Sequence, residues 1–148
     1  GIPVKPGENG PEKQKNPAGM AKTAVEWPIT PECLYWGPKF LYERYQTPIL
    51  ITENGMAGLD AIHLDGAVHD AIRIDYLHRY LLAYRRAAEE GIPLAGYFQW
   101  SFMDNFEWAK GYADRFGLVY VDYATQKRIP KDSAYWYGQT IAQNGENL

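Results

Sequence analysis

Two short apolar runs constrain the fold of this 148-residue chain more than any other feature. One run lies within residues 48–53 and the other within 94–101, and each is uninterrupted, as in a buried parallel strand. Between them, apolar residues recur at helical spacing from Asp70 onward, and Gly91 follows the last of them. This pattern predicts a helix that ends at a left-handed glycine and connects the two strands. We therefore expect 48–53 and 94–101 to be adjacent parallel strands.

Helices are expected at 31–46, 70–90 and 131–143, with Thr30 as the N-cap of the first. The order helix, strand, helix, strand, helix is typical of parallel strands with crossover helices. Two buried strands are too few for a doubly wound sheet, and a closed eight-stranded barrel needs about 250 residues. The sequence therefore predicts an α/β fold that is the C-terminal portion of a (β/α)8 TIM barrel. This portion contains two barrel strands and about three helices and is incomplete without an N-terminal complement.

The chain is expected to divide into a leading loop and one larger unit. Residues 1–20 are rich in Gly, Pro, Lys and Asn, which bury little apolar surface, and they predict a flexible loop. Residues 21–148 are expected to form the C-terminal portion of a single TIM-barrel catalytic domain. A further short β-like run at 118–121 precedes a segment, 128–133, that leads into the last helix.

The composition is that of a globular protein and excludes several classes of function. Apolar residues make up 46% of the chain, and its twelve Tyr and five Trp suit either a sugar site or an aromatic core. The net charge of −3 and the lack of a basic block argue against nucleic acid binding, and no apolar run is long enough for a membrane span. The single cysteine, Cys33, excludes an internal disulfide and is expected to be a small packed side chain. We expect a cytoplasmic protein.

A carboxylate stands directly after the first apolar run, in the segment Ile-Thr-Glu-Asn-Gly that contains Glu53. In an α/β barrel, the carboxyl end of a strand lies at the catalytic rim, so Glu53 is a candidate catalytic residue. A glutamate that caps a loop or pairs with an arginine would give the same local pattern.

Two tryptophans and two acids follow the second apolar run: Trp100, Asp104, Glu107 and Trp108. A carboxylate accepts hydrogen bonds from two sugar hydroxyls, and an indole ring stacks on the apolar face of a hexose. This composition suits a sugar-binding segment. The alternative is a buried aromatic cluster with solvated acids.

Several long motifs in the same order resemble glycoside hydrolase family 1. The segments PILITENG and GYFQWSFMDNFEW, separated by a helix that ends in EEGIP, resemble the seventh and eighth strand units of that family. The resemblance continues in EWPITPECLYW, RFGLVYVDY and RIPKDSAYWY and covers residues from about Lys22 to Ile141. It implies a TIM barrel that hydrolyses β-glucosides with retention of configuration, by double displacement and without a metal or cofactor.

The resemblance also implies roles for individual residues. Glu53 matches the catalytic nucleophile, and Glu107 matches the glutamate that binds the O4 and O6 hydroxyls of the sugar. Trp108 matches the tryptophan whose ring N–H binds O3. Trp100 matches the platform on which the sugar ring stacks.

Three further expectations follow from the same resemblance. Phe116 matches a ring that walls the O6 end of the sugar, and Trp27 resembles a tryptophan near the aglycone-side rim. The peptide bond between Trp100 and Ser101 is expected to be cis. Family members that act on 6-phosphorylated sugars replace the glutamate at the position of Glu107. A carboxylate there repels a phosphate, so the expected substrates are unphosphorylated β-D-glucosides such as aryl-glucosides and cellobiose.

The remaining charged residues have structural interpretations. His63 and His69 lie in a polar loop whose spacing fits no strong metal signature, so they are expected at the surface. Arg73 and Asp75 are expected to pair near the start of the second helix.

One essential group of the family pattern does not occur in this sequence. A retaining glycosidase needs a second carboxylate as acid/base, and the family places it in a TxNEP motif on the fourth strand. Three hypotheses follow: part of an active β-glucosidase completed by a separate N-terminal barrel fragment, a non-catalytic carbohydrate-binding or partner-binding fragment, and a structural remnant. We favour the first, and the intact binding set together with the intact nucleophile argues against the third.

Overall fold

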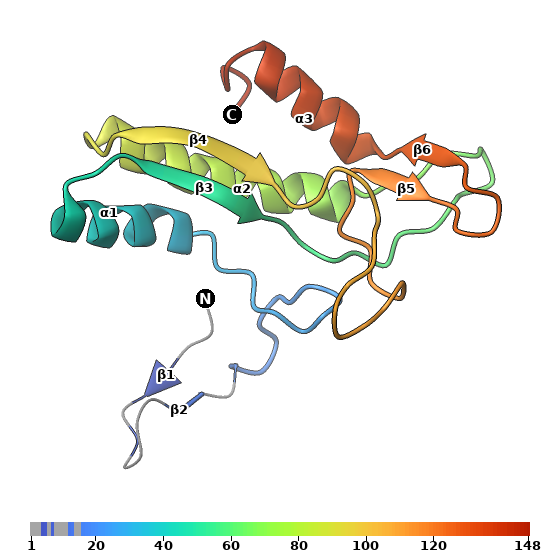
Figure 1. Ribbon diagram of the computed structural model, residues 1–148, viewed down its shortest axis with the longest axis horizontal. Helices are drawn as coiled ribbons and strands as arrows, with labels where there is room; N and C mark the ends of the chain where they lie inside the picture. The colour runs from blue at the N-terminus through green and yellow to red at the C-terminus, as the bar shows by residue number, and fades with distance from the viewer. Residues whose placement is uncertain (1–3, 6, 8–11, 14–15) are drawn as a thin grey trace.

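Two adjacent parallel strands lie at the centre of the molecule (Figure 1). The computed structural model describes residues 4–5, 7, 12–13 and 16–148. Strand β3 (Ile49–Asn54) pairs in parallel with β4 (Leu94–Gln99). This pairing confirms the arrangement that the two apolar runs predict.

Three helices accompany the strands: α1 (Cys33–Tyr45), α2 (Ala71–Glu89) and α3 (Asp132–Ala142). Figure 1 shows α2 behind β3 and β4, and α2 packs against both α1 and α3. The bounds agree with the predicted helices to within two residues. No helix in the part of the chain that the structure describes is long and apolar enough to cross a membrane.

The helix ends follow the sequence signals in part. Gly91 ends α2 with φ of 91°, and the Ile92 N–H donates to the Ala87 carbonyl at 3.1 Å, as in a Schellman motif. By contrast, Thr30 is not the N-cap of α1. A turn precedes the helix, in which the Cys33 N–H donates to the Thr30 carbonyl at 3.1 Å, so the first helical residue is Cys33.

Two short antiparallel pairs complete the described elements. β5 (Val119–Val121) confirms the predicted β-like run, and it pairs with β6 (Arg128–Pro130), which the sequence did not predict. A three-residue strand carries too little periodicity to be told from a loop. Near the N-terminus, β1 (Val4–Lys5) pairs with β2 (Glu12–Lys13). Half of the loop predicted over residues 1–20 lies outside the described residues.

An apolar core lies on the side of the strands that the helices cover. Its members are the buried residues Leu34, Met56, Tyr76, Leu77, Tyr80, Tyr84 and Leu118. The partly buried strand residues Ile51, Leu94 and Tyr97 pack against it. One face of the strand pair is therefore well packed.

The opposite face of the strand pair is open. Leu50 is 45% exposed and Phe98 is 59% exposed, although the sequence marks both as members of buried strands. Helix α1 adds further exposed apolar rings, among them Trp36 and Phe40. This chain therefore presents apolar surface that none of its described residues covers.

The first prediction concerns the chain as an isolated molecule. We expect the purified chain to self-associate or to lack a cooperative thermal transition. Among the described residues, the outer edges of β3 and β4 have no hydrogen-bonded neighbour strand, and the open face of the pair has no apolar cover. Folding still costs roughly 1–2 kcal/mol of backbone entropy per residue. Analytical ultracentrifugation with circular dichroism tests this expectation. A monodisperse monomer with a cooperative melt and no second polypeptide would contradict it.

Candidate active site

The end of β3 presents Glu53 to a cavity. Glu53 is exposed, and no described residue donates a hydrogen bond to its carboxylate. The chain then passes close to the end of β4 at Gly55, where an added Cβ would lie 1.8 Å from the Trp100 carbonyl oxygen. Only glycine fits at this crossing, which brings the two strand ends together.

The end of β4 presents Trp100 and a loop. The peptide bond between Trp100 and Ser101 is cis, as the family resemblance implied. Farther along the loop, Glu107 and Gly111 exchange two backbone hydrogen bonds, each 2.7 Å long. This tight turn fixes the backbone of Glu107, and Trp108 lies within the turn.

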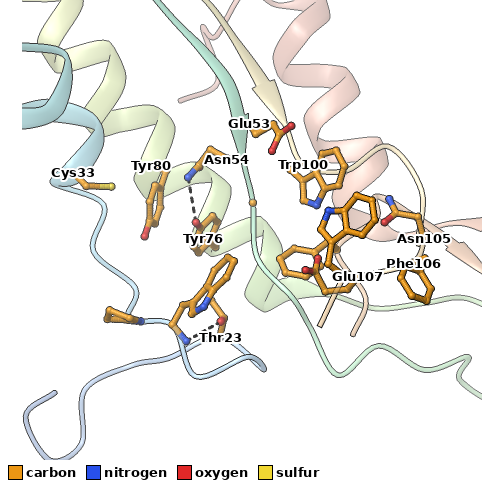
Figure 2. A pocket seen from close by; sticks show the side chains of 15 residues that line it. Thr23, Cys33, Glu53, Asn54, Tyr76, Tyr80, Trp100, Asn105, Phe106 and Glu107 are labelled. Carbon is orange, nitrogen blue, oxygen red and sulfur yellow. Dashed lines mark hydrogen bonds between the residues drawn. The ribbon is translucent and has the colours of Figure 1, made fainter. Parts of the chain in front are cut away.

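A cavity of about 550 Å³ brings the sequence-predicted site residues together (Figure 2). All six line it: Trp27, Glu53, Trp100, Glu107, Trp108 and Phe116. The rings of Trp27 and Phe116 are in contact, with centroids 6.0 Å apart. The cavity therefore has apolar ring surfaces and carboxylates on the same walls.

Three polar side chains of this cavity, Glu53, Glu107 and Trp108, are free to bind a ligand. Like Glu53, Glu107 receives no hydrogen bond on its carboxylate from any described residue, and Trp108 is 91% exposed. Two carboxylates and an indole N–H are therefore available to a polyhydroxylated molecule.

The structure separates the two acids of the β4 loop. Asp104 is 3% exposed and does not line the cavity with Glu107. Its carboxylate accepts hydrogen bonds from the Gly117 N–H at 2.9 Å, the Val121 N–H at 3.3 Å and the Arg115 guanidinium at 2.6 Å. Asp104 therefore does not face the cavity, because its backbone and cationic partners hold it in the interior.

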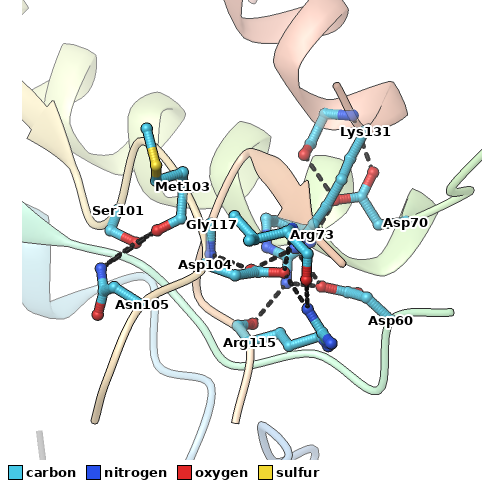
Figure 3. Close-up of polar contacts among 12 residues, drawn as sticks. Asp60, Asp70, Arg73, Ser101, Met103, Asp104, Asn105, Arg115, Gly117 and Lys131 are labelled. Atoms are coloured by element: carbon cyan, nitrogen blue, oxygen red, sulfur yellow. Dashed lines mark hydrogen bonds and ion pairs between the residues drawn. The ribbon is translucent and has the colours of Figure 1, made fainter. Parts of the chain in front are cut away.

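Lys131 links Asp104 to a second loop (Figure 3). Its ammonium group is fully buried and donates to Asp104 at 2.9 Å and to Asp60 at 2.5 Å. Burial lowers the pKa of Lys131, the positive charge of Arg73 lowers it further, and the two carboxylates act in the opposite direction. Lys131 therefore joins the loop after β3 to the loop after β4.

Arg73 extends this contact to the start of α2. It pairs with Asp70 and with Asp60, the latter at 2.7 Å, and its side chain is 1% exposed. The expected pair with Asp75 is wrong, because Asp75 binds Arg79 at 2.7 Å on the exposed face of the helix. Arg73 points inward because its partners, Asp60 and Asp70, are buried.

Asp70 connects the same network to α3. Although it is the N-cap residue of α2, its side chain makes no capping hydrogen bond. It accepts instead from the Ser133 N–H at 2.8 Å and the Ser133 hydroxyl at 2.6 Å. We call the six ionic groups the loop-anchor network: Asp60, Asp70, Arg73, Asp104, Arg115 and Lys131. Three positive charges balance three negative ones.

Sequence reasoning missed several residues that also line the cavity. Asn54 was not singled out, although it directly follows Glu53. Tyr76 and Tyr80 lie four residues apart on α2, and their rings stack with centroids 4.0 Å apart. A four-residue spacing on an apolar face indicates packing, so it gives no signal that these rings also border a cavity.

His69 and His63 lie away from the cavity lining. Both rings are in edge contact, 5.0 Å apart, and His69 lies between Asp132 at 2.7 Å and Asp65 at 2.9 Å. Within the described residues, no group of three or more His, Cys, Asp or Glu side chains is placed to hold a metal ion. The two aspartates raise the pKa of His69 to about 9, with Asp132 contributing most through its hydrogen bond.

Comparisons with known proteins agree with this fold. The profile of Glycosyl hydrolase family 1 matches residues 3–146. The chain is 54% identical over 127 residues to beta-glucosidase A of Thermotoga maritima, covering 85% of this chain and 28% of that protein. It is 50% identical over 133 residues to a bifunctional beta-D-glucosidase/beta-D-fucosidase of Bifidobacterium breve, covering 86% of this chain and 29% of that protein.

A solved structure shows the same arrangement. The beta-glucosidase from Thermotoga maritima in complex with a substituted glucoimidazole superimposes with a TM-score of 0.92 at 49% sequence identity, covering 96% of this chain and 32% of that one. This chain belongs to glycosyl hydrolase family 1, and its fold is a portion of that family's TIM barrel. It spans less than a third of the length of these relatives.

The second prediction concerns the loop-anchor network in a hybrid protein. In this hybrid, the chain replaces its matched segment in Thermotoga maritima beta-glucosidase A. We expect Lys131→Met to lower the free energy of unfolding by about 3–5 kcal/mol, because it leaves two buried carboxylates without their cation. Denaturant unfolding measures the loss.

Lys22→Met is the matched control for that variant. Lys22 pairs with Glu26 at 2.8 Å on the exposed surface, where removal of an ion pair changes stability little. Equal effects of the two substitutions would contradict a structural role for the buried network.

The third prediction concerns pH. The folded-state pKa of His69, about 9, lies above its ordinary value of 6.5. The stability gained from protonated His69 is therefore full below about pH 6.5 and is lost as pH rises through 9. In the hybrid protein we expect His69→Gln to flatten the decline in stability between these pH values. An unchanged pH profile would show that His69 is not held by Asp65 and Asp132.

Proposed function

We propose that this chain forms the nucleophile-bearing part of a retaining β-glucosidase. The observation that carries the proposal is the shared cavity, in which Glu53 and Glu107 both present carboxylates that accept no hydrogen bond from the described residues. Trp100 and Trp108 add ring surface and an indole N–H to the same walls. Acidic and aromatic groups in one cavity suit a sugar, which has both hydroxyls and apolar C–H surfaces.

In the proposed mechanism, Glu53 attacks the anomeric carbon of a β-glucoside. The bond from this carbon to the leaving oxygen breaks while a glycosyl ester to Glu53 forms, and a second carboxylic acid protonates the leaving oxygen. Water then attacks the same carbon, and the second group, now a base, takes its proton. Two displacements on one carbon retain the β configuration.

The second carboxylate is proposed to come from a complementary N-terminal part of the barrel. Retaining enzymes place the two carboxyl groups about 5–5.5 Å apart. The chain spans 28% of Thermotoga maritima beta-glucosidase A and contains no TxNEP motif, which supports a donor elsewhere in the barrel. The open apolar face around Leu50 and Phe98 is where such a part would pack.

The proposed substrates are terminal β-D-glucosides without a phosphate. Glu107 supports this choice, because it has no cationic partner among the described residues, and such a carboxylate repels a phosphate and accepts sugar hydroxyls. Two relatives are a beta-glucosidase and a combined beta-D-glucosidase/beta-D-fucosidase. We therefore propose a glucoside-type glycone and assign no preference for the aglycone.

The fourth prediction tests the nucleophile. The hybrid protein is expected to hydrolyse nitrophenyl β-glucoside, whereas Glu53→Gln is expected to lose at least about a thousandfold in rate and to keep its sugar affinity. The amide has the shape of the acid but cannot form the glycosyl ester. A mechanism-based fluoro-glucoside is expected to label Glu53, as peptide mapping would show.

Two results would reject the assignment. One is a label on another residue. The other is a cooperatively folded hybrid that binds glucose analogues but is neither active nor labelled. The latter would favour a non-catalytic carbohydrate-binding segment.

A further inference from the structure

The strand that carries Glu53 is irregular just before its end. Ile51 pairs with Tyr97 and Asn54 pairs with Gln99, so three steps along β3 match two steps along β4. The extra residue lies at the position of Glu53 or its neighbour Thr52, and such a β-bulge redirects side chains. The regular ladder therefore does not determine where Glu53 points.

The exposure of the β3 side chains shows the same irregularity, because the alternation between the two faces of the strand is interrupted. From Ile49 to Thr52 the residues of β3 alternate between partly buried and exposed, but Thr52 and Glu53 are both exposed in succession. Asn54 then returns to the partly buried side. Glu53 consequently faces the open side of the strand at a position where strict alternation would place it on the helix side.

Asn54 closes this bulge through both its backbone and its side chain. Its carbonyl oxygen accepts a hydrogen bond from the Trp100 N–H at 2.8 Å. Its side-chain oxygen accepts from the Tyr97 hydroxyl at 2.8 Å, and its side-chain amide donates to the Tyr76 hydroxyl at 3.3 Å. Figure 2 shows the Asn54 side chain directed toward Tyr76 and away from Glu53.

The two tyrosines that bind the Asn54 side chain, Tyr97 and Tyr76, are fixed by packing against other rings. The ring of Tyr97 packs against Tyr84 and Tyr137, with centroids 6.1 and 6.4 Å away. Burial raises the pKa of the Tyr97 hydroxyl, so this group remains a donor to Asn54. Tyr76 is 5% exposed and stacks on Tyr80. A rigid hydroxyl on β4 and another on α2 thus fix the Asn54 amide.

We propose that Asn54 is a positioning residue that aims Glu53 at the sugar by anchoring the β-bulge to Tyr97 and Tyr76. The inference rests on the proposed role of Glu53 as nucleophile. Asn54 itself does not react. Loss of its anchor would let the bulge relax and move the Glu53 carboxylate, while the residues that bind the sugar, Glu107 and Trp108, stay in place on the β4 loop.

The test is the rate at which a fluoro-glucoside labels Glu53 in the hybrid protein. Tyr97→Phe removes the hydroxyl and keeps the packed ring. We expect its maximal labelling rate to fall on the order of tenfold to a hundredfold, as for a small misplacement of a reacting group. The half-saturating concentration of the reagent should change little, because ground-state binding is unaffected.

Tyr84→Phe is the matched control. Its hydroxyl donates to the Gly96 carbonyl at 2.8 Å and to the Ile49 carbonyl at 3.3 Å, near the other end of the same strand pair. It should lower stability by an amount similar to that for Tyr97→Phe while leaving the labelling rate at the parent value. A combined Asn54→Ala and Tyr97→Phe variant should lose no more than Asn54→Ala alone, since both changes remove one interaction.

The outcomes separate this inference from the proposed function. A parent hybrid that is folded but not labelled at Glu53 would overturn both. A labelled parent in which Tyr97→Phe and Tyr84→Phe slow labelling equally, or in which Tyr97→Phe has no effect, would overturn the positioning role alone.

Discussion

The buried ammonium group of Lys131 is the contact on which the loops at the strand ends depend. It lies between Asp60, which follows β3, and Asp104, which follows β4, and none of the three side chains is more than 6% exposed. Taking such charges out of water is costly, so the arrangement persists only while every member keeps its partner. Arg73 and Arg115 complete the pairing of charges. The two loops therefore cannot move independently, and the cavity walls that they carry form one unit.

The polar groups on the two sides of the strand ends differ in whether they have hydrogen-bond partners. On the helix side, the Asp104 carboxylate and the Asn54 amide are hydrogen-bonded to partners within the protein. On the cavity side, Glu53 and Glu107 are left without partners among the described residues. Gly55 lets the two strand ends meet, because any side chain there would collide with the Trp100 carbonyl. The hydrogen bonds of Asp104 and Asn54 anchor the backbone segments that carry Glu53 and Glu107. The two free carboxylates are therefore held in place by a rigid scaffold.

The sequence predicted the regular elements well, because β3 and β4 are uninterrupted apolar runs and α2 has apolar periodicity with a clear C-terminal signal. It could not predict the irregular parts. Asp104 and Glu107 lie three residues apart in a loop without periodicity, and only the fold decides that Asp104 is buried whereas Glu107 is only partly buried and borders the cavity. Lys131 and Asp60 are 71 positions apart in sequence, so no local pattern connects them. The positions of the site residues were available from the family resemblance, whereas the β-bulge at Glu53 required the strand register.

The most direct test of this account is a crystal structure of the hybrid protein with a glucose-derived inhibitor bound. The account predicts that the sugar ring lies in the cavity on Trp100, with its hydroxyls bound to Glu107 and to the indole N–H of Trp108. The Glu53 carboxylate is expected directly below the anomeric carbon, with Asn54 still hydrogen-bonded to Tyr97. An inhibitor bound elsewhere, or one whose anomeric carbon faces away from Glu53, would contradict the assignment of this chain as the nucleophile-bearing part of a β-glucosidase.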